Sequence, residues 1–184
     1  MNVFTFGRIF ALSFVGLVAC GDDEETQVPV PEPMHTALAR LKNQNGADVG
    51  TVSFSQQLGG ETTQIKIAIT SGITPGEHGI HIHEVGRCDP PDFTSAGAHW
   101  NPTGEMHGDP RSGPHHSGDF GNVVISEDGT GDVELTSGRI SLEEGATHSI
   151  LGLSVIYHAN RDDYVTQEPP GNSGARLACG IITP

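Results

Sequence analysis

The stretch GIHIHEVGRC, residues 79–88, places two histidines two positions apart in an apolar run, with a cysteine five residues after the second. Along a β-strand successive side chains point to opposite faces, so Ile80 and Ile82 share one face and His81 and His83 share the other. Two imidazoles side by side fill a hydrophobic core poorly, but they are a good beginning for a metal site. We therefore expect both histidines to point inward from a strand and to bind a metal ion.

The sequence around this stretch predicts an all-β domain. Short runs with period-two alternation are separated by glycine and by Asn-Gly and Asp-Gly turns, and long helical periodicity is absent. Eight such runs indicate an antiparallel Greek-key barrel or sandwich. The predicted strands are TALARLKNQ (36–44), VGTVSFSQ (49–56), TTQIKIAIT (62–70), GIHIHE (79–84), FGNVVIS (120–126), GDVELT (131–136), ILGLSVIYH (150–158) and ARLACGIIT (175–183).

Two long polar segments interrupt the strands. Residues 84–119 are rich in Gly, Pro, His and Asp, and residues 159–175 form a second segment without a strand signal. Loops of this length inside a compact domain are usually functional or disordered, so we expect the chemistry to lie there. The first segment contains five candidate metal ligands, His99, His107, His115, His116 and Asp119.

Taken singly, each of these histidines is more often a surface residue or a hydrogen-bonded core residue than a ligand. Taken together they point to metal, because the His81-x-His83 pair and His116 three residues before Asp119 each place two ligands within reach of one ion. His158 ends the predicted strand before the second loop and adds a further donor.

The first 35 residues are expected to serve export and anchoring. The apolar run IFALSFVGLVA (9–19) follows the single charge of Arg8 and is too short to span a bilayer. LVAC (17–20) resembles the lipobox of bacterial lipoproteins, in which the cysteine is lipidated; an ordinary signal peptide with a chance cysteine is the alternative. The expected organisation is a signal peptide (1–19), a lipidated Cys20 with an acidic, proline-rich tether (20–35) and one folded domain (36–184). This organisation predicts a bacterial envelope protein that faces the periplasm and contacts the membrane through its lipid anchor.

The charge and the cysteine content limit which molecules the protein can bind and how its cysteines can pair. The chain has a net charge of −14, which becomes −15 without Arg8, and this argues against nucleic acid and anionic lipid surfaces as partners. If the substrate is an anion, positive charge must be concentrated locally. Of the three cysteines, lipidation removes Cys20 and leaves Cys88 and Cys179 free to pair in an oxidising compartment.

From about Leu38 to its end, the chain resembles the copper/zinc superoxide dismutases. The resemblance implies an eight-stranded antiparallel Greek-key barrel or sandwich of immunoglobulin-like architecture, with one copper and one zinc ion. It also implies that superoxide is disproportionated to dioxygen and hydrogen peroxide by alternate reduction and oxidation of the copper. The motifs that carry it, in the family's order, are HGIHIHE (78–84), SAGAHWNP (95–102), HSGDFGN (116–122) and GNSGARLACG (171–180).

The resemblance also assigns the metal ligands. His99 bridges the two ions, and His116 is preferred over its neighbour His115 because only His116 stands three residues before Asp119. The copper ligands implied are His81, His83, His99 and His158. The zinc ligands implied are His99, His107, His116 and Asp119.

Further residues receive supporting roles from the same resemblance. Asp162 is expected to hydrogen-bond one histidine of each metal, His81 and His107, and His78 to support the site from behind. Arg176 is the expected catalytic guide for the anion, next to His99 as the residue that carries a proton. A Cys88–Cys179 disulfide is expected to fix the loop near Arg176, whereas His35 and His148 match no ligand motif.

Two other functions remain open at this stage. One is a non-catalytic periplasmic lipoprotein that binds copper or zinc; the other, a hydrolytic zinc enzyme, would need a carboxylate base beside an open zinc position. The segment YVTQEPP (164–170) contains no lysine and only Arg161 lies nearby, so electrostatic steering is expected to be weaker or arranged differently from that in better-known members. Both a monomer and a homodimer are compatible with the sequence.

Overall fold

The computed structural model describes residues 33–184. The predicted signal peptide, the predicted lipidation site at Cys20 and most of the predicted tether lie outside the described residues. Within the described part, the only helix is one turn of 3-10 helix at Thr94–Ala96, and no helix there has the length and apolar character needed to cross a membrane. The all-β class predicted from the alternation is confirmed.

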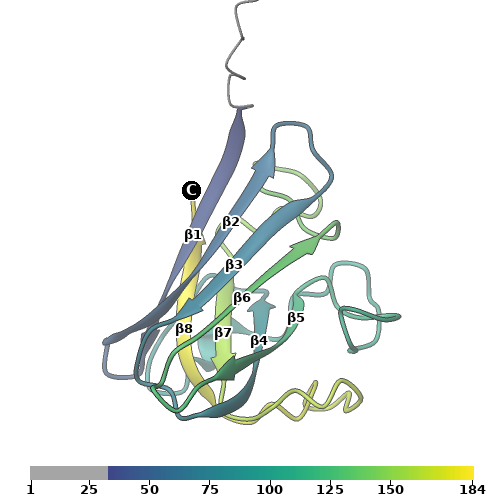
Figure 1. The fold of residues 1–184 in the computed structure, drawn as a ribbon. Coiled ribbons are helices and arrows are strands. Elements are labelled where there is room, and N and C mark those ends of the chain that lie inside the picture. Colours follow the sequence, from purple (N-terminus) through teal and green to yellow (C-terminus); the bar gives the residue numbers. More distant parts are fainter. Residues whose placement is uncertain (1–32) are drawn as a thin grey trace, which may run out of the picture. The chain divides into compact units, whose positions relative to one another are not determined.

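Eight strands make up the described domain (Figure 1). Their bounds are β1 (Met34–Asn43), β2 (Asp48–Gln57), β3 (Thr63–Ile69), β4 (Gly76–His83), β5 (Asp119–Ile125), β6 (Gly131–Ser137), β7 (Ser154–His158) and β8 (Arg176–Thr183).

The strands form one antiparallel sheet in the order β5-β4-β7-β8-β1-β2-β3-β6. Neighbours that are not consecutive in the chain, such as β4 with β7 and β3 with β6, show the crossovers of a Greek-key arrangement. The two outer strands approach each other, since a Cβ atom added to Gly131 of β6 would lie 2.4 Å from the carbonyl oxygen of Val124 in β5. The sheet is therefore a nearly closed barrel, as predicted.

The apolar core fills the inside of this barrel and leaves the histidines on its outside. Ile80 and Ile82 of β4 are fully buried in the main core together with Val155 of β7. His81 and His83 alternate with them and are equally buried, on the opposite face of the strand. The expectation that they point inward is therefore wrong in direction: they lie on the outer face of β4, where loops cover them.

The two long loops follow β4 and β7, which are neighbouring strands. Residues 84–118 connect β4 to β5, and residues 159–175 connect β7 to β8, close to the bounds predicted from composition. Part of the first loop packs on the outer face of the sheet, where Phe93 and Ala96 contact Ile156 of β7. Both loops therefore reach the face of the sheet that carries the histidines.

Candidate metal centre

Two groups of buried donor atoms lie side by side under the loops. We call them the four-histidine set (His81, His83, His99, His158) and the mixed set (His99, His107, His116, Asp119). Within each set one donor atom per residue lies within 4.8 Å of all the others, and every member is buried. His99 belongs to both sets, so the two sites share one imidazole. The structure thus brings together the same seven residues that the resemblance assigns to copper and zinc.

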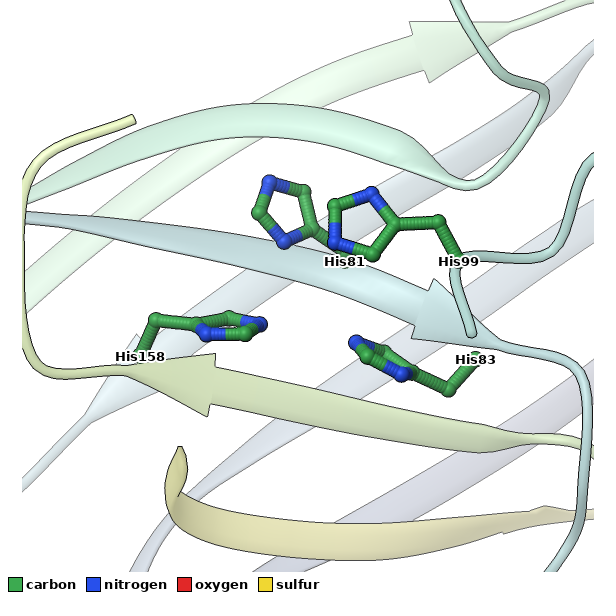
Figure 2. A group of neighbouring side chains, drawn as sticks. All are labelled: His81, His83, His99 and His158. Carbon is green, nitrogen blue, oxygen red and sulfur yellow. The ribbon is translucent and has the colours of Figure 1, made fainter. Parts of the chain in front are cut away.

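Neighbouring strands and one loop build the four-histidine set. His81 and His83 lie on β4 and His158 ends β7, while His99 comes from the first loop and forms a β-bridge with His83. Figure 2 shows the four imidazoles converging from β4, β7 and the loop. The ring centroids of His81 and His99 are 4.0 Å apart, and those of His83 and His158 are 5.6 Å apart.

The hydrogen bonds of these rings determine which ring nitrogen keeps an unshared lone pair that can bind a metal. His83 Nδ1 lies 2.9 Å from the carbonyl oxygen of Gly97, and His158 Nδ1 lies 3.3 Å from that of Gly174. Because a carbonyl oxygen only accepts, Nδ1 carries the proton in both rings and the lone pair of Nε2 is free.

The free nitrogens are buried and have no hydrogen-bond partner. They are Nε2 of His83, Nε2 of His158 and Nδ1 of His81, whose Nε2 donates to a carboxylate instead. Buried acceptors without partners are costly and rare in folded proteins. Three of them aimed at one point, together with His99, fit a metal ion that prefers imidazole ligands, such as copper.

Asp119, the first residue of β5, is the centre of the mixed set. Its Oδ1 lies 3.0 Å from His99 Nδ1 and 3.4 Å from His116 Nδ1, and its Oδ2 lies 2.9 Å from His107 Nδ1. Three imidazole nitrogens and one carboxylate oxygen are a suitable donor set for tetrahedral zinc. The rival His115 is outside both sets, with its Nδ1 2.9 Å from the carbonyl oxygen of Gly113.

Asp162 connects the two sets from behind. Its Oδ2 accepts a hydrogen bond from His81 Nε2 at 2.7 Å, and its Oδ1 accepts one from His107 Nε2 at 3.0 Å. The residue is fully buried, and Gly171 leaves room for it: a Cβ atom there would lie 2.5 Å from Asp162 Oδ1. Such carboxylate–histidine contacts fix the tautomer and the orientation of ligand rings.

Two further residues that the sequence did not single out hold Asp162. The Asn122 side chain accepts the Asp162 N–H at 2.7 Å and donates to the Asp162 carbonyl oxygen at 3.0 Å. The Tyr164 N–H donates to Asp162 Oδ1 at 2.7 Å, and the Tyr164 hydroxyl accepts from Asn122 at 2.8 Å. Asn122 lies at the end of the HSGDFGN motif, but no local pattern reveals a partner 40 residues further along.

The electrostatics of His83, His99 and His158 favour neutral rings. Burial, followed by the neighbouring histidines, holds the pKa of His83 and of His158 well below the ordinary value. Burial and the proximity of His81 lower the pKa of His99 to about 3. Neutral imidazole is the form that binds a metal, so these rings need lose no proton first.

In the mixed set, His107 and Asp119 have the opposite character, since both favour the charged form. Burial alone would raise the pKa of Asp119, but hydrogen bonds from His107, His116 and His99 outweigh it and hold that pKa far below the ordinary value. Burial alone would lower the pKa of His107, but hydrogen bonds to Asp119 and Asp162 outweigh it and raise the pKa to about 9. In the metal-free protein these shifts favour a protonated His107 beside an ionised Asp119.

A small pocket leads to the four-histidine set, and Arg176 lies in its wall. The pocket has a volume of about 280 Å³ and is lined by His83, His99, His158 and Arg176, with no carboxylate in the lining. The Arg176 guanidinium donates to the carbonyl oxygens of Phe93 and Gly97, both at 2.7 Å. The Arg176 guanidinium is therefore held in the wall of a pocket whose other lining residues carry no formal charge.

The predicted disulfide is confirmed. Cys88 and Cys179 are bonded, with their Cα atoms 5.6 Å apart, and join the first loop to β8. Arg176 begins β8, and its acceptors Phe93 and Gly97 belong to the same loop as Cys88. The bridge thus constrains both the guanidinium and the carbonyl groups that orient it.

The remaining histidines lie apart from the donor sets. His78 Nδ1 is 3.0 Å from the carbonyl oxygen of His158, and its Nε2 is 2.9 Å from that of Thr74, so this ring braces the main chain behind the four-histidine set. His35 and His148 belong to neither set, although His148 packs edge-on against Trp100.

Comparisons with known proteins agree with this geometry. The family model for copper/zinc superoxide dismutase matches residues 49–182. Proteins named extracellular superoxide dismutase [Cu-Zn] are 37% identical over 159 residues in Brugia pahangi and 40% identical over 154 residues in Onchocerca volvulus. These matches span 80% and 79% of this chain and 75% and 74% of the two relatives.

Solved structures give the same result. A double mutant of a SOD-like protein from Bacillus subtilis is 38% identical with a TM-score of 0.70, and the match covers 80% of this chain and 97% of that one. The clock protein EA4 is 34% identical with a TM-score of 0.71, over 85% of this chain and 98% of that one. Motifs, fold, donor geometry and relatives agree, and the chain belongs to the copper/zinc superoxide dismutase family.

Proposed function

We propose that the protein is a superoxide dismutase, in which the four-histidine set binds copper and the mixed set binds zinc. The observation that carries this proposal is the sharing of His99 by the two sets, beside a pocket whose wall contains Arg176. Copper bound there supplies a one-electron oxidant for one superoxide and a one-electron reductant for the next, whereas zinc has no redox chemistry. Two superoxide ions and two protons then give one dioxygen and one hydrogen peroxide.

His99 is the residue we assign to proton transfer. Its Nδ1 faces Asp119 in the zinc set, so its Nε2 is the nitrogen that remains for the copper set. Burial, followed by the proximity of His81, lowers the pKa of the ring, so the metal-free ring carries one proton and not two. A proton carried at Nε2 would lie in the wall of the pocket, in position to be given to a peroxide anion.

Arg176 is assigned to binding and orienting the anion. Its guanidinium is held by two carbonyl groups and stays a cation, although burial lowers its pKa from the ordinary value. A planar, fixed guanidinium beside the copper set can donate to superoxide by charge-assisted hydrogen bonds. No other cation lines this pocket in the described part of the chain.

The test is superoxide dismutation by the purified, oxidised protein loaded with copper and zinc. We expect fast turnover that the metal-free protein lacks, and a loss of about tenfold or more in Arg176→Ala, with partial activity in Arg176→Lys because a charge remains. Activity no greater than that of free copper, despite full metal content, would reject the enzyme and leave a metal-binding protein.

We also propose that the protein is exported and lipid-anchored as a bacterial lipoprotein. The support is the apolar run before Cys20, the acidic and proline-rich stretch after it, and a disulfide of the kind formed in oxidising compartments. The proteins it resembles in two nematodes are named extracellular enzymes. Expression with radiolabelled palmitate should label the parent and not Cys20→Ala; equal labelling, or none in either, would reject the anchor.

A homodimer is proposed as the assembly. The support is the presence of exposed apolar side chains on the domain, including Val85 and Ile181, which are 37% and 40% exposed. Light scattering of the metal-loaded protein should give twice the mass of one chain, and a mass of one chain would reject the dimer.

A further inference from the structure

We propose that Gln167 is a positioning residue for the zinc site, which holds the main chain of His107 ready for metal binding. The proposal rests on the function proposed above, in which His107 is a zinc ligand. It assigns a task to the second long loop, residues 159–175, which contributes no member to either donor set.

One amide group satisfies both main-chain polar groups of His107. The His107 N–H donates to Gln167 Oε1 at 2.9 Å, and Gln167 Nε2 donates to the His107 carbonyl oxygen at 3.0 Å. Within residues 33–184, neither group of His107 has a hydrogen bond to another main-chain group. Since His107 is only 3% exposed, water is a poor substitute for these partners.

The other zinc-set residues are held by main-chain contacts of their own surroundings. His99 forms a β-bridge with His83 of β4. The Asp119 N–H donates to the His116 carbonyl oxygen at 3.1 Å, and the His116 N–H donates to Asp119 Oδ2 at 2.9 Å. His107 differs from them because its main chain depends on a side chain 60 residues away.

The segment that carries Gln167 is itself well ordered by hydrogen bonds. Asp163 accepts from the N–H groups of Val165 and Thr166 at 3.0 and 2.9 Å, and from the Thr166 hydroxyl at 2.6 Å. Gln167 Nε2 also donates to the Val165 carbonyl oxygen at 3.1 Å. The segment around Gln167 is thus ordered by its own hydrogen bonds, so the Gln167 side chain loses little conformational entropy when it binds the main chain of His107.

Fixing the main chain completes the orientation of the His107 ring. Asp162 already holds the ring at Nε2, and the other ring nitrogen, Nδ1, faces Asp119. A ligand held at both its ring and its main chain does not have to be ordered when zinc binds. Gln167 is neutral and exposed, so its contribution comes from these two hydrogen bonds and not from charge.

The experiment measures zinc release from the copper- and zinc-loaded protein to the chromogenic chelator 4-(2-pyridylazo)resorcinol, together with the absorption bands of Co²⁺ bound in place of zinc. Gln167→Met keeps the length of the side chain and removes both hydrogen bonds, whereas Gln167→Glu keeps only the acceptor for the His107 N–H. Gln64→Met is the matched control, because Gln64 is an exposed glutamine on β3 that makes no side-chain hydrogen bond in the described chain.

We expect zinc release to be about three- to tenfold faster in Gln167→Met, intermediate in Gln167→Glu and unchanged in Gln64→Met. The Co²⁺ bands should shift in Gln167→Met, a change that a purely structural role would not produce. Zinc release and Co²⁺ bands equal to those of the parent would overturn the proposal while the zinc site stands. If Asp119→Asn also left both readouts unchanged, the zinc assignment itself would fail, and the role of Gln167 with it.

Discussion

At the scale of single residues, the metal-free protein holds a proton where we propose zinc to bind. His107 faces Asp119 with Nδ1, at 2.9 Å, and Asp162 with Nε2, at 3.0 Å, so a carboxylate lies next to each ring nitrogen. Because a neutral imidazole has only one N–H, this arrangement favours the protonated ring and explains the raised pKa of about 9. Zinc must displace that proton to bind.

This competition predicts a pH dependence for zinc. As the pH falls from about 9 to about 6.5, zinc affinity should decrease by up to about tenfold per pH unit, because Zn²⁺ binds the neutral ring. Copper affinity should change less over the same range, since the pKa values of His83, His99 and His158 are lowered. Chelator competition at several pH values measures both metals in one protein, and a zinc affinity independent of pH would contradict this account.

The same proton affects the stability of the metal-free protein. The pKa of His107 is about 9 in the folded state and about 6.5 in the unfolded state. Protonation of His107 therefore adds its full contribution to the free energy of unfolding below about pH 6.5, and this contribution is lost as the pH rises through about 9. Denaturant unfolding of the metal-free protein should therefore show this contribution disappearing between about pH 6.5 and pH 9, and adding zinc should restore stability at the alkaline end.

At the scale of the elements, the two loops are held in place by few but specific contacts. The 84–118 loop is bonded to β8 by the disulfide, and the 159–175 loop closes tightly around Asp162. Gly171 shows how tight the second loop is, since it has a φ of 69° and no room for a side chain next to the carboxylate. The geometry of both donor sets thus depends on loop residues that belong to neither set.

Gly171→Ala tests this dependence. The new methyl group would displace the Asp162 carboxylate, and zinc affinity should fall by about 10- to 100-fold. Gly145→Ala is the matched control: Gly145 has a similar φ of 77° but no atom within 4 Å of the added Cβ, so it has the backbone strain without the clash. Zinc affinity is measured by chelator competition. An equal decrease in both variants would mean that backbone strain, and not displacement of the Asp162 carboxylate, causes the loss of affinity.

The disulfide makes a separate prediction about stability. The bonded cysteines are 91 residues apart, and a cross-link over such a loop is worth about 4 kcal/mol in the chain-entropy description. Cys88→Ser/Cys179→Ser should lower the free energy of unfolding of the metal-free protein by about that amount, measured in urea under non-reducing conditions. An unchanged denaturation midpoint with an unchanged slope would show that the bridge adds no stability.

At the scale of the whole molecule, a negatively charged protein has to attract a negatively charged substrate. The chain has a net charge of −14, yet the pocket at the copper set is lined by one arginine and no carboxylate. Arg161, the other cation expected near the site, forms an ion pair with Glu77 and contributes less. Attraction near the pocket and repulsion at long range therefore act against each other.

Salt distinguishes these two effects. In the parent protein kcat/KM should fall as ionic strength rises, because the attraction of Arg176 is screened. In Arg176→Ala the repulsion alone remains, so kcat/KM should rise with salt. Arg40→Ala removes the same charge from an exposed position on β1 and should keep the slope of the parent. Identical slopes for all three proteins would exclude local steering by Arg176.

The comparison of sequence and structure shows where local patterns are informative. Alternation placed β2, β3 and β6 to within about one residue, because each strand has one face in the core. β7 begins only at Ser154, four residues later than predicted, since Gly152 has a φ of 82° and is not extended. β4 begins earlier than predicted, at Gly76, because Glu77 and His78 pair with β5 despite their lack of alternation.

The residues of the two donor sets could be predicted from short motifs, whereas the residues that hold them could not. His116 and Asp119 are three positions apart and signal a shared ion by spacing alone. Asn122 and Gln167 act on partners 40 and 60 residues away, and an asparagine or glutamine has no distinctive local pattern. Such contacts follow from the packing of two loops, which the local sequence does not specify.

One contact has a thermodynamic consequence for the order in which metals are taken up. The Asp162 carboxylate hydrogen-bonds a histidine of each donor set, so a shift of this one group at either site changes the orientation of a ring at the other. The two binding equilibria are then coupled, and linkage requires the coupling to be reciprocal: the factor by which zinc changes the affinity for copper is the factor by which copper changes the affinity for zinc. A substitution that removes the carboxylate should therefore change both factors equally.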